Sequence, residues 1–389
     1  MIQPHLGFYR TSGINFSSKV DALLYSQTQN NSKVSWHFND RVFDHFDWTI
    51  EPNESLDELY DQRSRQLREK YDYIILSFSG GADTNNILES FYRQGLVIDE
   101  VVTNHMTRAT SNITVLDPRV KDSWNFGAEH QLQAVPRLQW IKDNMPQTKI
   151  TELDVSDSVI NGIIHGYQDA EWVQRHNDHL SVGQLFRYNY WHFSELRKRF
   201  DSHQRVAIIV GADKPRCSID EDNNFWLSFV DTVANITTIN DFNKDNDNIT
   251  TELFYWAGES ASMICKQAHV IRHWLVANPQ YQSAWQGVNF NKMRLIQERI
   301  MRPLLYTTWN DSWYQADKST QWWHTEFDTW FHRQDELKQQ RQQWQHGIDY
   351  LAKQLPQWIR LNPQGQPDSF VPFTKRYLVG KIENKILLS

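Results

Sequence analysis

Two adjacent glycines and an acid follow a run of apolar residues in "YDYIILSFSGGADTNNILESF", at Tyr71–Phe91. A glycine loop between a strand and a helix exposes backbone N–H groups at the helix N-terminus, where the helix dipole also favours anions. Two glycines let a phosphate approach the main chain with no Cβ in the way, and Ser79 and Thr84 add hydroxyl donors. Asp83 would repel a phosphate but could bind Mg²⁺ beside one. The alternative is a tight turn in which Asp83 or Thr84 caps the helix.

A second polar cluster, "VGADKPR" at Val210–Arg216, also follows a run of apolar residues. Ligands in open α/β sheets gather at the carboxyl ends of strands. If the two strands are neighbours, Asp213, Lys214 and Arg216 face the same crevice as the glycine loop. Cations there can neutralise the charge that develops on a transferring phosphate. The alternative is a surface loop with a solvated salt bridge.

Other residues that could in principle bind a phosphate, a metal ion or a base are interpreted as structural. Lys266 lies in a predicted helix, where an exposed lysine is favoured over a phosphate ligand. His176 and His179 have no acid at ligand spacing, which favours surface histidines over a metal site. Tryptophans of the C-terminal half could stack on bases, but helical spacing favours packing in a core. They are Trp322, Trp323, Trp330, Trp344 and Trp358.

Alternating strands and helices must position these residues. Apolar runs predict strands at Tyr73–Phe78, Leu96–Met106, Lys149–Val155 and Arg205–Arg216. The helix after Asn53, with Ser55 as its N-cap, precedes the first of them. The pattern beyond Phe225 becomes helical, up to a tail after Pro363 that contains glycine and proline and carries no assignment. Further helices are expected at Ser181–Arg199, Ser260–Val276, Asn291–Met301, Ser319–His332 and Asp335–Ile359. Strands that alternate with helices indicate βαβ units and a mainly parallel, doubly wound sheet in an α/β fold.

The string Ser79-Gly80-Gly81-Ala82-Asp83-Thr84 is neither G-x-x-x-x-G-K-[ST] nor G-x-G-x-x-G. It resembles the SGGxDS pyrophosphate loop of the PP-loop ATP pyrophosphatases, which include asparagine synthetase-type, NAD synthetase-type and tRNA-lysidine synthetase-type enzymes. Thr84 replaces the usual Ser and keeps the hydroxyl. The motif covers Tyr71–Glu89, and the resemblance extends more loosely to Lys266. These enzymes split ATP between the α and β phosphates and pass AMP to a substrate oxygen.

The resemblance implies roles for particular residues. Asp83 would bind Mg²⁺, and Asp83, Lys214 and Arg216 would be the catalytic residues. ATP would be held by Ser77, Phe78, Ser79, Gly80, Gly81, Ala82, Asp83, Thr84, Thr103 and Gly211, with Leu76, Ser77, Phe78 and Thr103 near the adenine. The fold would be of the PP-loop (HUP) type: an N-terminal α+β extension at 1–66, a nucleotide-binding domain at 67–285 and a Trp-rich helical region at 286–389.

Absent residues narrow the chemistry. Position 2 is Ile, whereas amidotransferases with an N-terminal nucleophile need Cys there. The chain has no C-x-x-C, which the sulfur-transferring relatives use, and no Cys after Cys265, which the phosphosulfate reductases need. What remains is adenylation of an acceptor, followed by attack of an amine or similar nucleophile. The alternatives are a sulfonucleotide reductase-like enzyme that uses an external thiol, and a nucleotide-binding protein without catalysis.

The composition predicts where the protein is found in the cell and which partners it binds. The net charge of −7 argues against a protein coated in basic residues for duplex binding. Two cysteines and the lack of an apolar run of membrane-spanning length predict a cytoplasmic protein with no membrane partner. The acceptor is left open between a small molecule and tRNA or another nucleic acid.

Overall fold

A parallel sheet forms the centre of the protein, as a computed structural model shows. The structure describes residues 7–110, 129–167, 169, 172–175, 198–201, 203–211, 214–231, 248–286, 290–313, 331–356, 359–361, 367–369 and 374–382. Five strands make the sheet, in the order β10-β7-β4-β5-β6, and all their pairings are parallel. They are β4 (Tyr73–Ser77), β5 (Glu100–His105), β6 (Lys149–Asp154), β7 (Val206–Val210) and β10 (Ile249–Leu253). With its helices this sheet confirms the predicted α/β class.

The central strands are apolar because helices and loops cover both faces of the sheet. Ile74, Ile75 and Leu76 of β4 are at most 1% exposed. After β4 the chain adds β5 and β6 on one side, and it then returns to add β7 and β10 on the other side. The order of strands therefore reverses between β4 and β7, and such a reversal opens a crevice at the carboxyl ends of the two strands.

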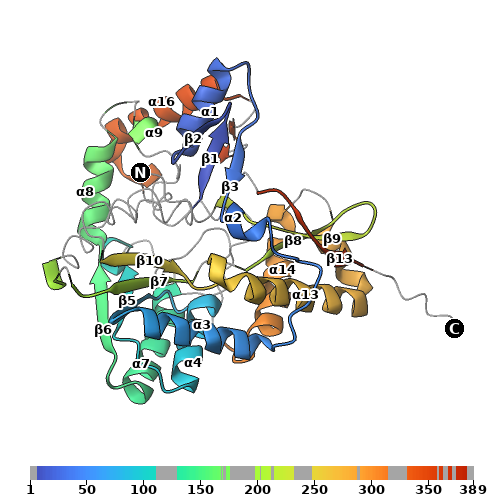
Figure 1. Cartoon of the computed structure of the whole chain (residues 1–389). Helices are drawn as coiled ribbons and strands as arrows, with labels where there is room; N and C mark the ends of the chain where they lie inside the picture. The colour runs from blue at the N-terminus through green and yellow to red at the C-terminus, as the bar shows by residue number, and fades with distance from the viewer. Residues whose placement is uncertain are drawn as a thin grey trace.

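Helices α3 (Leu56–Lys70) and α4 (Ala82–Arg93) flank β4 in the chain and pack together. Ser55 and Glu58 form a capping box at the start of α3, which satisfies otherwise unpaired N–H groups. The hydroxyls of Ser64 and Ser90 lie 2.7 Å apart between the two helices. Figure 1 shows α3, α4 and α7 (Val135–Asn144) together on one side of the strands, with β1–β3 on the other side.

The remaining elements surround this unit. The other helices are α1 (Lys19–Thr28), α2 (Asp40–Phe43), α5 (Thr107–Thr110), the π-helix η2 (His130–Ala134), α8 (Ser156–Gly166), α9 (Trp172–Arg175), α13 (Ala261–Ala277), α14 (Phe290–Leu305) and α16 (Lys338–Gln354). Short 3-10 helices lie at η4 (Gly258–Ser260), η5 (Pro279–Trp285) and η6 (Asp335–Leu337). Among the residues described here, no helix is long and apolar enough to span a membrane.

Smaller antiparallel sheets complete the architecture. One has the order β2-β1-β3, with β1 (Phe8–Thr11), β2 (Ile14–Phe16) and β3 (Ser35–His37). Another has the order β13-β9-β8, with β8 (Arg216–Ile219), β9 (Asn224–Ser228) and β13 (Tyr377–Lys381). The strands β11 (Ile359–Leu361) and β12 (Pro367–Ser369) form a pair. The boundaries at 66 and 285 stay a prediction.

The expectation of helix beyond Phe225 is wrong for β9 and β10. A sheet partner distant in the sequence completes each of them: β10 joins β7, and β9 joins β13. β13 itself lies in the tail after Pro363, for which no element was predicted. The expected helices at Ser260–Val276 and Asn291–Met301 are confirmed by α13 and α14. Most of Ser181–Arg199 and Ser319–His332 lies outside the described residues.

Two interpretations of single residues have different outcomes. Lys266 is not an exposed lysine: it is half-buried on α13, and its Nζ lies 2.8 Å from a carboxylate oxygen of Glu51. Trp344 is 4% exposed on α16, which confirms core packing for that tryptophan. Trp322, Trp323, Trp330, Trp358, His176, His179 and Asp213 lie outside the described residues.

Candidate functional site

The glycine loop joins β4 to α4 at the carboxyl edge of the sheet, where the order of strands reverses. Gly80 has φ +75°, and a Cβ at this residue would lie 2.7 Å from the Cα of Ala134. The side-chain amide of Asn85 holds the loop by donating to the carbonyl of Gly80. Arg137 in turn donates to Asn85 at 2.9 Å. Left-handed backbone and close packing against η2 therefore account for Gly80 without any ligand.

Gly81 has no such structural reason. It is the N-cap of α4, with φ −68° and ψ 167°, which every residue type adopts. The nearest neighbours of an added Cβ would be the Ser79 hydroxyl at 3.2 Å and the Gln133 amide at 3.9 Å. Serine, threonine, aspartate or asparagine is the usual N-cap, because its side chain binds the first N–H groups of the helix. Here the N-cap carries no side chain that could do so.

The alternative in which Asp83 or Thr84 caps α4 is wrong, because Gly81 is the N-cap. No side chain caps this helix in the described part of the chain. The Thr84 hydroxyl donates to the Gly81 carbonyl at 3.2 Å, and the Asp83 carboxylate accepts from Lys214 and Tyr306. The first-turn N–H groups of an α-helix have no partner within the helix. The N-terminus of α4 therefore presents donors that an anion could accept from.

The Asp83 carboxylate binds a buried lysine. Lys214, which follows β7, places its Nζ 2.7 and 3.0 Å from the two oxygens of Asp83. The Lys214 side chain is 3% exposed and that of Asp83 is 25% exposed. A second carboxylate, that of Glu298 on α14, lies 3.2 Å from the same Nζ. The Tyr306 hydroxyl donates to Asp83. Lys214 thus lies between two acids beside the start of α4.

Two buried tyrosines donate hydrogen bonds to Asp83, Tyr306 to its carboxylate and Tyr255 to its backbone carbonyl. Burial raises the pKa of Tyr306 and of Tyr255 well above 10, and the charge of Asp83 raises both further. The hydroxyls therefore stay protonated at neutral pH and act as donors. Tyr255 donates to the backbone carbonyl of Asp83 at 2.8 Å and accepts from Asn86 at 3.0 Å. The position of the carboxylate is fixed by this network.

Some of the other predicted site residues lie at the loop or its cavity, and others lie in the core or in another sheet. Gly211 lies against α4, since its added Cβ would be 3.1 Å from the methyl group of Thr84. Thr103 lies with Ser79 at one cavity. Phe78, by contrast, is 3% exposed and belongs to the core. Arg216 is 4% exposed and begins β8, in a different sheet from the loop. Ser77 and Ala82 flank the loop, at the end of β4 and the start of α4.

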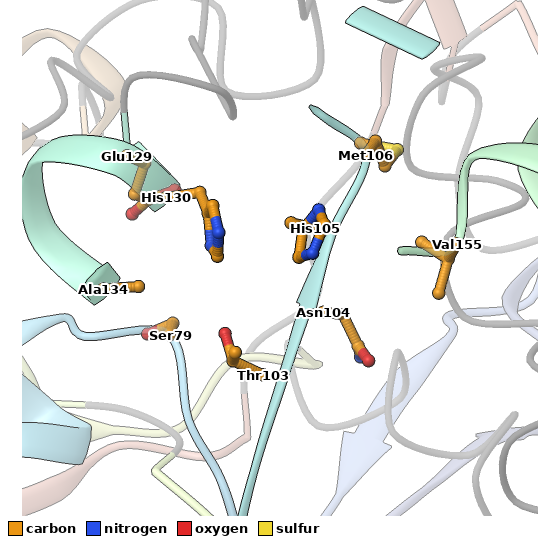
Figure 2. A pocket seen from close by; sticks show the side chains of 9 residues that line it. All are labelled: Ser79, Thr103, Asn104, His105, Met106, Glu129, His130, Ala134 and Val155. Carbon is orange, nitrogen blue, oxygen red and sulfur yellow. The ribbon is translucent and has the colours of Figure 1, made fainter. Parts of the chain in front are cut away.

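A small cavity lies beside the loop, at the carboxyl ends of β5 and β6. It measures about 20 Å³, room for about one water molecule or ion. Figure 2 shows His130 and His105 facing each other across it, with Ser79 and Thr103 close by. The lining residues are Ser79, Thr103, Asn104, His105, Met106, Glu129, His130, Ala134 and Val155. The cavity therefore has a mixed lining, polar at Ser79, Thr103 and the two histidines and apolar at Met106, Ala134 and Val155.

The two histidines of the cavity form a close pair. Their ring centroids are 4.4 Å apart, and the planes meet at 29°. Burial, which is the larger cause, and the neighbouring His105 together lower the pKa of His130 to about 4. His130 is therefore a neutral imidazole at neutral pH, with a lone pair on one ring nitrogen.

Neither cysteine can act as a thiolate at neutral pH. Burial raises the pKa of Cys265 to about 12 and that of Cys217 higher still. A reductase with this chain would need a thiol from elsewhere, as the sequence already indicated.

Comparison with known proteins adds no family: no protein-family model matches the chain, and no curated protein matches it significantly.

Several residues of the site were not predicted from the sequence. Glu298, Tyr255 and Tyr306 come from segments far from the loop and carry no motif. His105 was visible as a polar residue at the end of a predicted strand, but nothing in the sequence linked it to His130.

Proposed function

We propose that the N-terminus of α4 binds the phosphates of ATP, and that the protein is a PP-loop-type enzyme forming AMP and pyrophosphate. The observation that carries the proposal is Gly81, an N-cap with room for a side chain and none present. The absence of a side chain leaves the first N–H groups of α4 open to a phosphate. Gly80, next to it, supports the proposal less, because packing alone requires a glycine there.

The charges around the loop support the same reading. Lys214 brings a buried ammonium group to the start of α4, where it would stabilise negative charge on a leaving pyrophosphate. Asp83 and Glu298 hold that ammonium and are the carboxylates nearest to it. Asp83 would share its two oxygens between Lys214 and a Mg²⁺ ion that accompanies the nucleotide. Such an ion would neutralise phosphate charge and orient the nucleotide.

The size of the cavity limits how ATP could bind. Pockets for ligands of this size measure about 300–1,000 Å³, whereas the cavity beside Ser79 measures about 20 Å³. The side chains around Ser79 would therefore have to move apart to admit adenosine. At Gly81 the atoms nearest to an added Cβ are the Ser79 hydroxyl at 3.2 Å and the Gln133 amide at 3.9 Å, so the phosphates would meet only these two side chains there.

In the proposed reaction an acceptor oxygen attacks the α-phosphorus of ATP. The bond from that phosphorus to the bridging oxygen breaks, and pyrophosphate leaves with the electron pair. An amine or similar nucleophile then displaces AMP from the adenylated acceptor. Lys214 and the N–H groups of α4 would stabilise the charge on the departing pyrophosphate.

Release of pyrophosphate from ATP and Mg²⁺, measured across pools of tRNA, nucleotides and amino acids, tests the proposal. AMP and pyrophosphate are the expected products, and Lys214→Gln should remove the activity. Arg205→Gln, which removes an exposed cation paired with Asp72, is the matched control and should keep it. ADP and phosphate as products would exclude adenylation.

A further inference from the structure

Three potential metal ligands converge at the cavity beside the loop. His105 ends β5, His130 begins η2, and Glu152 lies on β6 next to β5. Ligand atoms of these three side chains all lie within 4.8 Å of one another. Two atoms that bind one tetrahedral Zn²⁺ at about 2.1 Å lie about 3.4 Å apart. The three side chains would therefore have to approach one another to complete the site, and Glu152 is exposed and can move.

An unsatisfied polar atom marks the same place. His130 is 8% exposed, and its ring faces the cavity (Figure 2). Its buried Nδ1 has no hydrogen-bond partner among the described residues. A buried polar atom without a partner destabilises the protein, because it has lost its hydrogen bonds to water, so a group that binds the imidazole would remove that cost. Asn104 lines the same cavity, and its buried amide oxygen also has no hydrogen-bond partner among the described residues.

Hydrogen bonds to Thr107 fix the ring of His105. Nδ1 accepts from the Thr107 backbone N–H at 3.4 Å and lies 3.0 Å from the Thr107 hydroxyl. The proton of the neutral ring is therefore on Nε2 in this structure. To offer Nε2 to a metal, the ring would shift its proton to Nδ1, from which it could donate to the Thr107 hydroxyl.

From these observations we infer that His105, His130 and Glu152 bind one divalent transition-metal ion of the Zn²⁺ class. Two imidazoles and one carboxylate are a ligand set of zinc sites and of other first-row metals, with a position left open for water. The cavity of about 20 Å³ provides room for the ion itself. The site is distinct from the Mg²⁺ position proposed at Asp83, and it does not depend on ATP.

A second group of three ligands, Glu51, His269 and His273, is the natural rival. Its carboxylate is already bound by Lys266 at 2.8 Å, and that ammonium would repel a divalent cation. Glu152 has no ion pair with any residue in the described ranges. The rival group supplies the matched control, because His273 is an exposed histidine.

Calorimetric titration of the full chain with Zn²⁺, after treatment with a chelator and without nucleotide, tests the inference. Wild type should bind one equivalent. His105→Gln and Glu152→Gln should each lose more than the about 10–100-fold in affinity that a lost outer-shell partner costs. His273→Gln should bind as wild type does. Circular dichroism shows whether each variant is folded, and Glu152→Gln changes only an exposed side chain.

Titration with Co²⁺ gives a second readout, since its visible absorption reports on the ligands. Wild type and His273→Gln should share one spectrum, and Glu152→Gln should lose or change it. The inference is overturned if folded wild type binds no Zn²⁺. It is equally overturned if Glu152→Gln and His105→Gln bind as tightly as wild type, or if His273→Gln is the variant that loses binding.

Discussion

Lys214 and Asp83 are 131 positions apart in the chain, and the Lys214 Nζ lies 2.7 Å from the Asp83 carboxylate. The order of strands brings them together: β4 and β7 are neighbours in the sheet, and each residue follows the carboxyl end of one of them. The two polar clusters seen in the sequence are thus one cluster in the structure. This contact connects the charge of the proposed phosphate site to the stability of the fold.

Lys214→Met should destabilise the protein more than Asp83→Asn. Without the lysine, the carboxylates of Asp83 and Glu298 lose their shared cation, and removal of one partner from a buried pair costs about 3–5 kcal/mol. Asp83→Asn removes the negative charge to which Lys214 and Tyr306 donate but keeps one amide oxygen as an acceptor, at a cost of about 1.5–3 kcal/mol, and it leaves Lys214 with Glu298. Urea denaturation of both variants measures the free energies of unfolding. Equal costs, or a larger cost for Asp83→Asn, would mean that Glu298 does not support the lysine.

Gly80→Ala should destabilise the protein more than Gly95→Ala. Both glycines have positive φ, at +75° and +65°, and left-handed backbone costs a residue with a side chain about 1–2 kcal/mol. Only at Gly80 would the new Cβ also meet backbone, 2.7 Å from the Cα of Ala134, whereas nothing lies within 4 Å at Gly95. The difference in the free energies of unfolding therefore isolates the close approach of η2 to the loop. A difference of zero would contradict that approach.

Acid should weaken the fold through Glu252 on β10. Burial alone raises the pKa of Glu252, but Arg63, Lys70 and the Tyr71 hydroxyl outweigh burial, and the pKa in the folded protein is lowered. Arg63 lies 2.9 Å and Lys70 2.7 Å from the carboxylate. Because the folded state favours the charged form, its contribution is complete above the unfolded pKa of about 4.3. The contribution is lost as pH falls below that value toward the lower pKa of the folded state.

The comparison that checks this is wild type against Glu252→Gln, by urea denaturation over a range of pH. At neutral pH the variant should be less stable by about 3–5 kcal/mol, since Arg63 is buried and loses its carboxylate. Below pH of about 4.3 the two stabilities should converge. A gap that stays constant in acid would show that the carboxylate contributes no charge-dependent stability.

Local patterns in the sequence predicted the parts of the fold that local forces determine. Ser55 and Glu58 predict the start of α3, because a cap and the acid after it act within one turn. The apolar run before Ser79 predicts a buried central strand. The strand β10 was missed because β7, a partner distant in the sequence, completes it, and its own residues give a weak pattern.

Contacts between residues distant in the sequence also limited the prediction of the candidate site. The glycine loop is contiguous and could be found, and Lys214 could be paired with it only on the assumption of neighbouring strands. Tyr306 reaches Asp83 across 223 positions, with no spacing that predicts the contact. Gly80 and Gly81 look equivalent in the sequence. Only the structure separates them, because packing requires one and leaves the other unexplained.

The most direct test of ATP binding at α4 is calorimetric titration of MgATP into wild type and Gly81→Ala. The fold should tolerate the alanine, since the backbone of Gly81 suits any residue and its added Cβ meets only the Ser79 hydroxyl at 3.2 Å. Gly258→Ala, another glycine with ordinary backbone and side-chain contacts only, is the control. Wild type and Gly258→Ala should bind MgATP. Gly81→Ala should bind at least about tenfold more weakly, the loss of one charge-assisted hydrogen bond. Equal affinity in a folded Gly81→Ala, or no binding by wild type at millimolar ATP, would contradict a phosphate site at this helix.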